Sequence, residues 1–438
     1  LLASSAASDV YKRQFPYLAA KYGGGIFLLI YILLALTFGY TMIVAETSLG
    51  RMTRKSPVGA FASFTKSHTL KAGGWINAII PILIVPYYSV IGGWVIKYLF
   101  EYICGNGTKL AEDGYFSMFI SDGVSAEICF IVFALITLTI IFAGVRNGIE
   151  RVSKFMMPIL VVLSVIIAIY SVTRPGALKG IQYFLVPNLE NFSWMTVVSA
   201  MGQMFYSLSI AMGILVTFGS YMKKETSIEN STRNVEVFDT AIAIMAGLMI
   251  IPAVFAFSGG DPNTLQAGPS LMFITIPKVF ASMGLGTVVG ILFFVLVLFA
   301  AVTSSIALTE SAVSTFEDEL HWNRKKSTVV IGIIMLALGT LSSLGYGPLD
   351  AVKILGMQFL DFFDFLTNSV MMPIAAIATC LLVSRVIGVD RIEEEMTQEG
   401  GTFRRKKIFV MMIKYLCPVF AAIILISSVM NAFGLISM

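Results

Sequence analysis

The chain has little charge. Only 13% of its 438 residues are Asp, Glu, Lys or Arg, whereas 57% are hydrophobic. A water-soluble protein could not keep that much apolar surface away from solvent. Apolar runs of about twenty residues, the length that crosses a bilayer as a helix, recur along the sequence. The composition therefore predicts an all-α polytopic membrane protein and leaves no room for a soluble catalytic domain.

Cysteine and histidine are also scarce, and neither is placed for chemistry. The two histidines, His68 and His321, fall in loops, which excludes an imidazole proton relay within the spans. The four cysteines lack the spacing of a metal site or a disulfide framework, and we interpret all of them as packing residues: Cys104, Cys129, Cys380 and Cys417. The sequence shows no nucleophile–base pair, metal cluster or phosphate-binding loop, so the chain is predicted not to be an enzyme.

Hydrophobic segments divide the chain into ten full spans and a short apolar stub, eleven in all. The stub begins at Phe15 and ends in a glycine turn at residues 23–25. The full spans are predicted at residues 25–49, 75–103, 124–145, 150–172, 194–222, 236–258, 285–316, 328–345, 354–388 and 407–435.

Positive charge marks one side of this protein. Lys and Arg are few in alternate loops and concentrate in the others, at residues 51–71, 146–154, 223–233, 324–326 and 385–407. Basic loops stay in the cytoplasm during insertion. We therefore expect a multi-pass protein of the plasma or inner membrane with these loops inside, and no nucleic-acid partner despite the net charge of +4. The charged stretch 390–407 is predicted to be a solvated loop.

The first fourteen residues differ in character from the rest of the chain. Residues 1–14 are polar, do not begin with Met and lack the charged-then-apolar order of a signal peptide. We interpret them as a junction segment or a truncation, with the natural first half-span missing. A single transmembrane domain is expected over residues 15–435.

The segment 202–221 is the most informative in the chain. It belongs to a predicted span that would be roughly 40 Å long as one helix, more than the roughly 30 Å hydrocarbon core requires. Irregular backbone at this depth persists only where it is buried in protein or lines a cavity. Small, poorly helix-forming residues alternate in its middle: Ser207, Ser209, Ala211 and Gly213. A break here would form a binding site, and a tilted continuous helix is the alternative.

Further polar side chains lie at membrane depth, where they are costly and indicate function by default. Residues 303–305 set three hydroxyls in a row. Hydroxyl and carbonyl oxygens suit a monovalent cation such as Na⁺, whereas a divalent ion would require more carboxylates. Hydroxyls that join neighbouring helices are the alternative. Glu46, Asp239 and Glu310 are acids in or beside apolar spans, and each of them could be structural.

Together these features resemble the bacterial eleven-span branch of the neurotransmitter:sodium symporter family, typified by the bacterial leucine transporter. No single piece is decisive, but the matching pieces run in family order along the chain, and the ordered set is highly specific. They are Phe15-Pro16, Ala19-Ala20, Gly23-Gly24-Gly25, Glu46, Gly50-Arg51, Tyr87-Tyr88, Gly148-Ile149-Glu150-Arg151, Gly202-Gln203, Ser207-Leu208-Ser209, Thr303-Ser304-Ser305 and Glu317-Asp318-Glu319-Leu320.

The resemblance implies an inverted five-plus-five helix repeat with broken first and sixth spans, and thus favours an unwound segment within 202–221. The first repeat would cover 15–172 and be incomplete, because the amide and carbonyls that the family's first span gives to both sodium sites lie before Phe15. The second repeat would cover 194–388, and 407–435 would be an additional span.

Two sodium sites are implied by the same resemblance. The first takes Ser207 and Asp239, helped by the substrate carboxylate. The second takes the carbonyl of Ala300 and the hydroxyls of Thr303 and Ser304. Asp239 stands where chloride-dependent relatives carry an amide, so we expect that chloride is not required.

The implied substrate pocket is mostly apolar, which suits a small neutral, hydrophobic amino acid. Its members are Ile84, Tyr88, Tyr206, Ser207, Ser209, Met212, Ser304 and Leu308. The resemblance places the Tyr88 hydroxyl on the substrate carboxylate and Glu46 against the unwound backbone. Ala211 stands where glycine is common and narrows one wall.

Gating residues are implied as well. Tyr206 would close over the substrate from outside, and Asp364 fits the acid of an outer gate whose usual arginine position is Gln14. Gly148 and Pro158 fit a family spacing that would let the cytoplasmic start of the fifth span unwind, although an ordinary helix start is the alternative.

The expected function is sodium-coupled uptake of a small neutral amino acid by alternating access, with the lipid bilayer and the amino acid as partners. One alternative keeps the fold and uses protons through Glu310 or Asp239. The other is a sensor or inactive fragment that binds an amino acid without transporting it.

Overall fold

The computed structural model describes residues 14–258 and 270–435. Within them the regular structure is helical, and the β-type pairs are isolated bridges, Gly24 with Pro187 and Ile354 with Met357. The prediction of an all-α protein is confirmed. The interpretation of the N-terminal segment and the break expected in the first span fall on residues 1–13 and lie outside the described part.

Nine helices in the described part are long and apolar enough to cross a bilayer. Several combine α-helical and π-helical turns. They are α3–η2–α4 (Gly25–Leu34, Ala35–Gly39 and Tyr40–Thr53), α6 (His68–Ile103), α9 (Gly123–Phe142), η3–α10 (Val145–Glu150 and Arg151–Val172), α14 (Ile228–Ser258), α16 (Gly286–Leu320), α17 (Arg324–Leu344), α18–η7–α19–η8 (Phe359–Asp364, Phe365–Met371, Met372–Leu381 and Leu382–Ile387) and α21–η10–α22 (Lys406–Met411, Met412–Leu416 and Cys417–Ala432).

Two predicted spans are not single long helices. The sixth is divided into α12 (Trp194–Ser207) and α13 (Ile214–Tyr221), and the stub forms the short helix α2 (Gln14–Lys21). With the nine long helices they account for the eleven predicted spans. The remaining helices lie in connections: α5 (Pro57–Phe64), α7 (Gly107–Leu110), α8 (Tyr115–Ser121), α11 (Ala177–Leu185), η4 (Leu189–Asn191), η6 (Leu271–Thr275), α15 (Ile276–Ala281), α20 (Val389–Thr397) and η9 (Gln398–Gly400).

Some helices begin away from the predicted boundaries. α6 begins at His68 rather than at 75, and α14 begins at Ile228 rather than at 236. Hydropathy marks only the part of a helix that lies in hydrocarbon, whereas the hydrogen-bonded helix continues into the polar layer. The tenth span begins at Phe359 rather than at 354, because a turn with positive φ at Leu355 and Gly356 precedes it.

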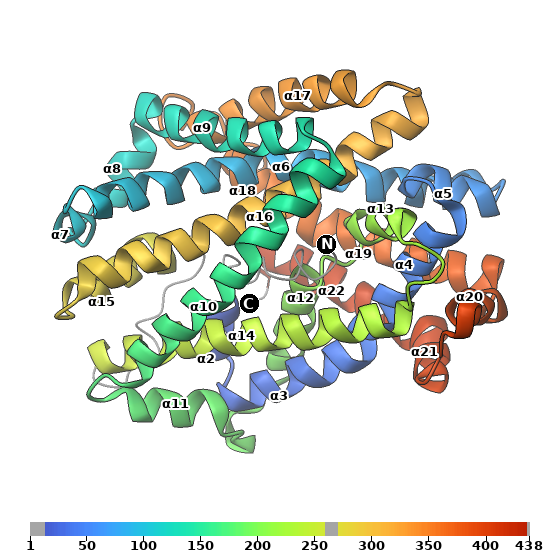
Figure 1. The fold of residues 1–438 in the computed structure, drawn as a ribbon. Helices are drawn as coiled ribbons and strands as arrows, with labels where there is room; N and C mark the ends of the chain where they lie inside the picture. Colours follow the sequence, from blue (N-terminus) through green and yellow to red (C-terminus); the bar gives the residue numbers. More distant parts are fainter. Residues whose placement is uncertain (1–13, 259–269, 436–438) are drawn as a thin grey trace.

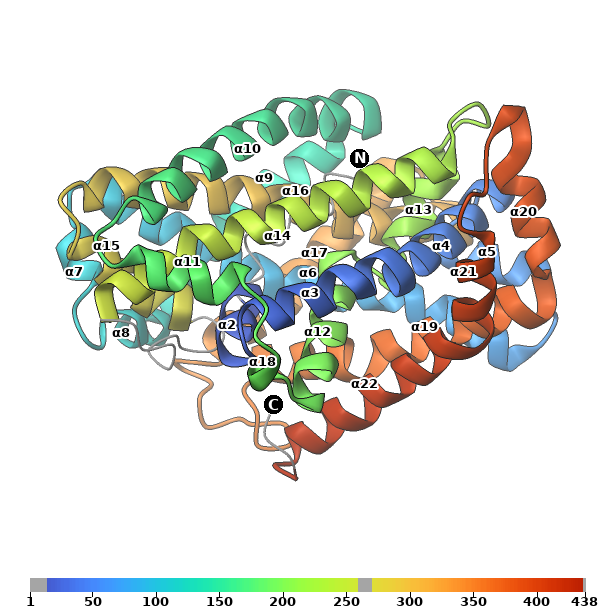
Figure 2. The same ribbon diagram turned by 90° about the horizontal axis from the view of Figure 1, so that it is seen from below.

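Two groups of helices meet at the break in the sixth span, and the second half of that span, α13, belongs to one of them. The α6 group consists of α6, α9, α16 and α17, which contact one another, and the α4 group consists of α4 with α13 and α14, both of which it contacts. In Figure 1, α16 crosses the molecule between the layer of α6, α9 and α17 and helix α14. In both views α7, α8 and α15 gather at one end, and α5, α20 and α21 gather at the other (Figure 1 and Figure 2).

The prediction of a solvated loop over 390–407 is wrong for its first half. This part forms α20, and one face of α20 is buried: Val389 is 9% exposed, Ile392 0% and Met396 1%. The spacing of these three residues is that of a helical stripe facing a protein core. The surrounding charges concealed this stripe in the sequence.

Candidate functional site

The break in the sixth span covers residues 208–213. Three of its residues have left-handed backbone, Ser209 with φ 54°, Ala211 with φ 58° and Gly213 with φ 71°. This conformation costs a residue that has a Cβ roughly 1–2 kcal/mol, so Ser209 and Ala211 require compensating contacts. The predicted unwound segment is confirmed, and the alternative of a continuous helix is wrong.

Glu46 on α4 provides one of these contacts. Its Oε1 accepts a hydrogen bond from the backbone N–H of Ala211 at 2.9 Å, and the whole side chain is buried. Two residues further along, a Cβ at Gly213 would lie 2.8 Å from the backbone oxygen of Asn77 and 3.1 Å from Oγ of Ser311. The unwound segment is therefore enclosed by α4, α6 and α16.

Ser207 and Asp239 lie together where α12 ends. The hydroxyl of Ser207 lies 2.8 and 3.0 Å from the two carboxylate oxygens of Asp239 and donates to them. Tyr31 on α3 donates to Oδ2 of Asp239 at 2.6 Å, and its hydroxyl lies 2.5 Å from Oγ of Ser207. All three side chains are fully buried. One carboxylate among hydroxyl oxygens fits a hard monovalent cation.

The other predicted ion ligands share one turn of α16. The hydroxyls of Thr303 and Ser304 lie 2.9 and 3.0 Å from the carbonyl oxygen of Ala300, to which both donate. This buried set of three oxygens carries no charge, so it also suits a weakly bound monovalent ion. Ser305 instead accepts a hydrogen bond from Thr137 on α9 at 3.1 Å, so its hydroxyl joins two helices.

The predicted substrate residues come from three segments that meet around the break. α6 and α16 pack against each other, and the unwound segment lies beside both. The residues are buried apart from the partly buried Tyr206, and they are Ile84 and Tyr88 on α6, Ser304 and Leu308 on α16, and Tyr206, Ser207, Ser209 and Met212 in or beside the break. Three of these side chains are apolar, and the other five carry a hydroxyl as their polar group.

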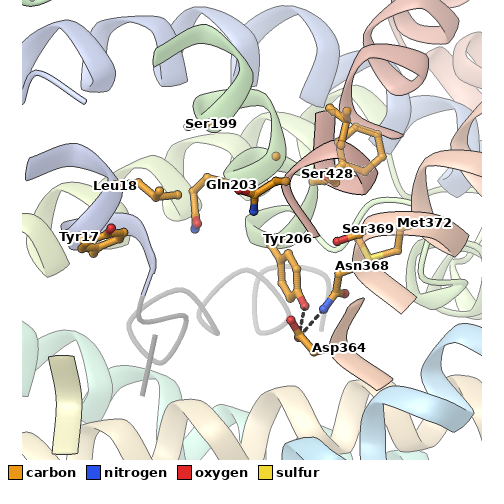
Figure 3. Close-up of a pocket in the computed structure, with 14 residues that line it drawn as sticks. Tyr17, Leu18, Ser199, Gln203, Tyr206, Asp364, Asn368, Ser369, Met372 and Ser428 are labelled. Atoms are coloured by element: carbon orange, nitrogen blue, oxygen red, sulfur yellow. Dashed lines mark hydrogen bonds between the residues drawn. The ribbon is translucent and has the colours of Figure 1, made fainter. Parts of the chain in front are cut away.

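A cavity of about 250 Å³ lies on the α12 side of the break (Figure 3). Tyr206 and Asp364 meet at its wall, where the Tyr206 hydroxyl donates to Oδ1 of Asp364 at 3.0 Å. Asn368 donates to the same oxygen at 2.5 Å and to the hydroxyl of Tyr87 at 3.2 Å. The two residues expected at an outer gate are thus in direct contact, which joins α12 to α18.

Glu310 is bound by an arginine. Arg324 donates to both carboxylate oxygens of Glu310, at 3.1 and 2.5 Å, and Tyr221 at the end of α13 donates to Oε1 at 2.8 Å. Glu310 is fully buried. These contacts join α13 to α16 and α17 and favour the structural role for Glu310.

The start of the fifth span is helical in this structure. Gly148 lies in the π-helical turn η3, and a Cβ there would come within 2.1 Å of the carbonyl oxygen of Ile140. Pro158 lies inside α10, where it cannot donate to the helical hydrogen bonds. The helix is formed across both residues, and its unwinding during transport stays a prediction.

Sequence reasoning missed three members of these sites. Tyr31 lies in an otherwise apolar run, Asn368 follows the predicted gate acid by one turn, and Arg324 was counted only as a loop charge. The one usable signal was Tyr31, because a phenol within a membrane span must find a partner for its hydroxyl.

Comparison with known proteins gives a consistent result. The family model described as the sodium:neurotransmitter symporter family matches residues 8–108 and 117–435. The sodium-dependent transporter YhdH of Bacillus subtilis is 32% identical over 430 residues, which are 97% of this chain and 93% of that protein. A sodium-dependent transporter of Haemophilus influenzae is 30% identical over 430 residues, 95% of this chain and 93% of its own length.

A solved structure shows the same fold. The crystal structure of MhsT in complex with L-phenylalanine matches with a TM-score of 0.86 and 32% sequence identity. The match covers 98% of this chain and 97% of MhsT.

Proposed function

Because the chain belongs to the sodium:neurotransmitter symporter family, a family of membrane transporters and not of enzymes, we propose that it carries a neutral, hydrophobic amino acid into the cell together with Na⁺. The break at 208–213 carries this proposal. It opens the backbone of a buried span next to Ser207 and Asp239, where α4, α6 and α16 meet.

Two Na⁺ ions are proposed, each as cargo. One is held by Ser207 and Asp239, and the other by the Ala300 carbonyl with Thr303 and Ser304. The oxygen-only donor sets support both assignments. If the substrate carboxylate completes the first set, Na⁺ and amino acid raise each other's affinity by the same factor.

The substrate side chain is proposed to lie among Ile84, Met212 and Leu308. These side chains offer apolar surface without a charge. MhsT, which is similar along nearly the whole chain, was crystallised with L-phenylalanine. Leucine and phenylalanine are therefore the first candidates, and Ala211 on one wall disfavours the largest side chains.

Chloride is proposed to be unnecessary. The carboxylate of Asp239 already places a negative charge beside Ser207, fixed by the hydroxyl of Tyr31. A mobile anion would add a second negative charge to the same buried space, which like-charge repulsion opposes.

The orientation of the protein in the membrane is proposed from the charge pattern. We place the end with α5, α20 and α21 in the cytoplasm, because the basic loops lie there. Tyr206 and Asp364 then face outward and Tyr221 with Glu310 faces inward, so each side of the break has its own closing contact.

A proton-coupled cycle through Glu310 finds no support. Instead, the bidentate contact with Arg324 joins α16 to α17, and the contact with Tyr221 joins α16 to α13, so Glu310 has a structural role that accounts for its burial.

The test is uptake of labelled leucine, phenylalanine, tryptophan and alanine into proteoliposomes. An inward Na⁺ gradient is expected to drive accumulation of at least one of them, whereas a pH gradient without Na⁺ is not. A second chain, with residues 1–14 replaced by the matching segment of YhdH, tests the interpretation of the N-terminal segment. If neither chain accumulates any of the four, the proposed function is wrong and the sensor alternative gains support.

A further inference from the structure

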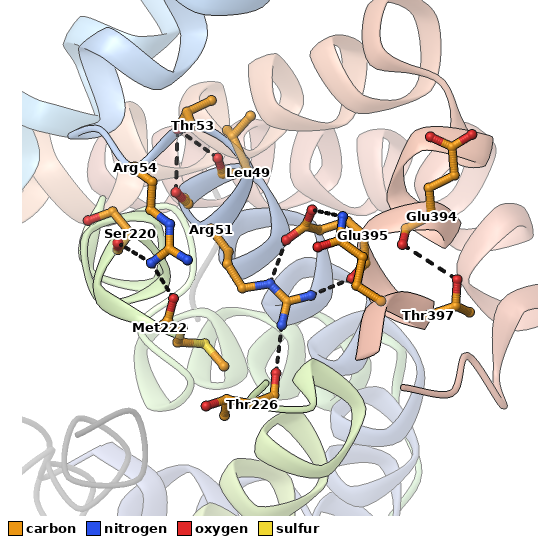
Figure 4. Close-up of polar contacts among 12 residues, drawn as sticks. Leu49, Arg51, Thr53, Arg54, Ser220, Met222, Thr226, Glu394, Glu395 and Thr397 are labelled. Carbon is orange, nitrogen blue, oxygen red and sulfur yellow. Dashed lines mark hydrogen bonds and ion pairs between the residues drawn. The ribbon is translucent and has the colours of Figure 1, made fainter. Parts of the chain in front are cut away.

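Arg51 at the end of α4 attaches α20 to the α4 group (Figure 4). Its Nε donates to Oε1 of Glu395 at 2.5 Å, its Nη2 donates to the backbone carbonyl of Glu395, and its Nη1 donates to the backbone carbonyl of Thr226 at 2.6 Å. Arg51 is 3% exposed. Thr226 lies in the loop between α13 and α14. The guanidinium of Arg51 therefore joins α20 both to α4 and to the α13–α14 loop.

Arg405 makes a second attachment from the same loop. Its guanidinium donates to both carboxylate oxygens of Glu236 on α14, at 3.0 and 2.6 Å, and to the backbone oxygen of Leu36 at 3.2 Å. It also stacks 3.7 Å from the ring centre of Tyr40, whose hydroxyl donates to Glu229. The loop is thus held to α14 and to the α3–η2–α4 helix.

The chain before α20 leads to the other group of helices. α20 follows directly on η8, the last part of the helix that begins at α18 and carries Asp364. In this helix α19 packs mainly against α6 rather than α4, and α6 is a member of the α6 group. The segment from α19 to Arg405 therefore runs from the α6 group to the α4 group at the end that holds α5, α20 and α21 (Figure 2).

We propose that the α20 segment is a cytoplasmic clasp, formed by Arg51 with Glu395 and by Arg405 with Glu236, that limits the inward opening of the transporter. This inference rests on the proposed alternating-access function. Inward opening requires the inner ends of the α4 and α6 groups to separate. The clasp resists that separation with two charge-assisted attachments, a buried one at Arg51 and a partly buried one at Arg405.

The chain provides matched controls. Glu393 and Lys406 form an ion pair at 2.5 Å that joins α20 to α21 within the same loop, with side chains 37% and 40% exposed. Glu393 is two residues from Glu395, and Lys406 is next to Arg405. Neutralising the control residues removes the same charges without breaking an attachment to the α4 group.

The test measures access to the inner side. In a protein from which the four native cysteines have been removed, Ser311 on α16 is replaced by cysteine. Ser311 is buried, and its hydroxyl lies 3.2 Å from the hydroxyl of Thr217 on α13. Labelling by a membrane-impermeant maleimide is followed in inside-out vesicles, with Na⁺ or with K⁺. The thermal unfolding midpoint of each purified variant is measured alongside.

In Na⁺, Glu395→Gln and Arg405→Gln are expected to raise the labelling rate about fivefold or more, the effect of removing the charge from one partner of a charge-assisted hydrogen bond. Glu393→Gln and Lys406→Gln are expected to leave it within about twofold of the parent rate. Equal rates for the clasp and control variants overturn the proposal, whether or not their unfolding midpoints fall. If labelling of the parent does not differ between Na⁺ and K⁺, the proposed transport cycle fails and the clasp fails with it.

Discussion

The role of Glu46 gives the sharpest test of the site. In Glu46→Ala, the backbone N–H of Ala211 loses the acceptor that lies 2.9 Å away in a fully buried position. An unpaired buried donor costs about 1–3 kcal/mol. If the amino acid binds only to the unwound form of 208–213, this penalty weakens binding by about 5-fold to 150-fold.

Glu46→Gln separates hydrogen bonding from charge. The amide oxygen of Gln can accept from Ala211 as the carboxylate does, so we expect an affinity within about fivefold of the parent. Glu127→Ala is the control, because it removes a carboxyl that accepts from Thr340 on the α9–α17 contact, away from the break. It is expected to lower the unfolding midpoint and leave the affinity unchanged.

The assay is Na⁺-dependent equilibrium binding of labelled phenylalanine or leucine to purified protein, with the unfolding midpoint measured in parallel. Parent-like affinity in Glu46→Ala would refute the reasoning, since Glu46 would then be a packing residue only. A loss in Glu46→Gln as large as that in Glu46→Ala would refute the acceptor role and assign the effect to charge.

Three further predictions concern the ion ligands. Tyr31→Phe removes the hydroxyl that lies 2.6 Å from Asp239. The Na⁺ concentration for half-maximal uptake should then rise about 5-fold to 10-fold, which corresponds to a lost hydrogen bond of about 1–1.4 kcal/mol. An unchanged Na⁺ titration would contradict this prediction. Asp239→Asn removes the fixed negative charge beside Ser207, and its uptake should fall when gluconate replaces chloride, whereas uptake by the parent should not; equal chloride responses would rule out the charge-replacement account. Thr303→Ala should raise the Na⁺ concentration for half-maximal uptake about tenfold. Ser305→Ala loses only a hydrogen bond between two helices, so it should lower the unfolding midpoint and leave the Na⁺ titration unchanged. A Na⁺ titration of uptake and calorimetry of each variant measure these two effects.

The positions of the spans could be predicted from local rules, whereas local rules left the break open against a continuous helix and the family resemblance decided for it. About twenty apolar residues form a span, and small residues with hydroxyls in the middle of an overlong span favour unwound backbone. Ser209 and Ala211 do adopt left-handed backbone. Local rules could not supply their support, because Glu46 lies 165 residues from Ala211 in the sequence.

Polar contacts between residues far apart in the sequence could not be predicted. Nothing in the local pattern pairs Tyr31 with Asp239, 208 residues away, or Arg51 with Glu395, 344 residues away. The clasp was missed for a second reason. Dense charge in α20 indicated solvent exposure, although Ile392 and Met396 form a buried stripe beneath it. The family resemblance supplied the ion ligands, which spacing alone left open.

Reciprocal binding is the most direct test of the central claim, that Na⁺ and an amino acid bind together at the break. The affinity for labelled phenylalanine or leucine is measured at several Na⁺ concentrations, and the affinity for Na⁺ is measured at several amino-acid concentrations, in the parent and in Ser207→Ala. We predict that each ligand raises the affinity for the other by the same factor, at least about tenfold, and that this factor shrinks in Ser207→Ala. Amino-acid affinity that is independent of Na⁺ in the parent would contradict the account.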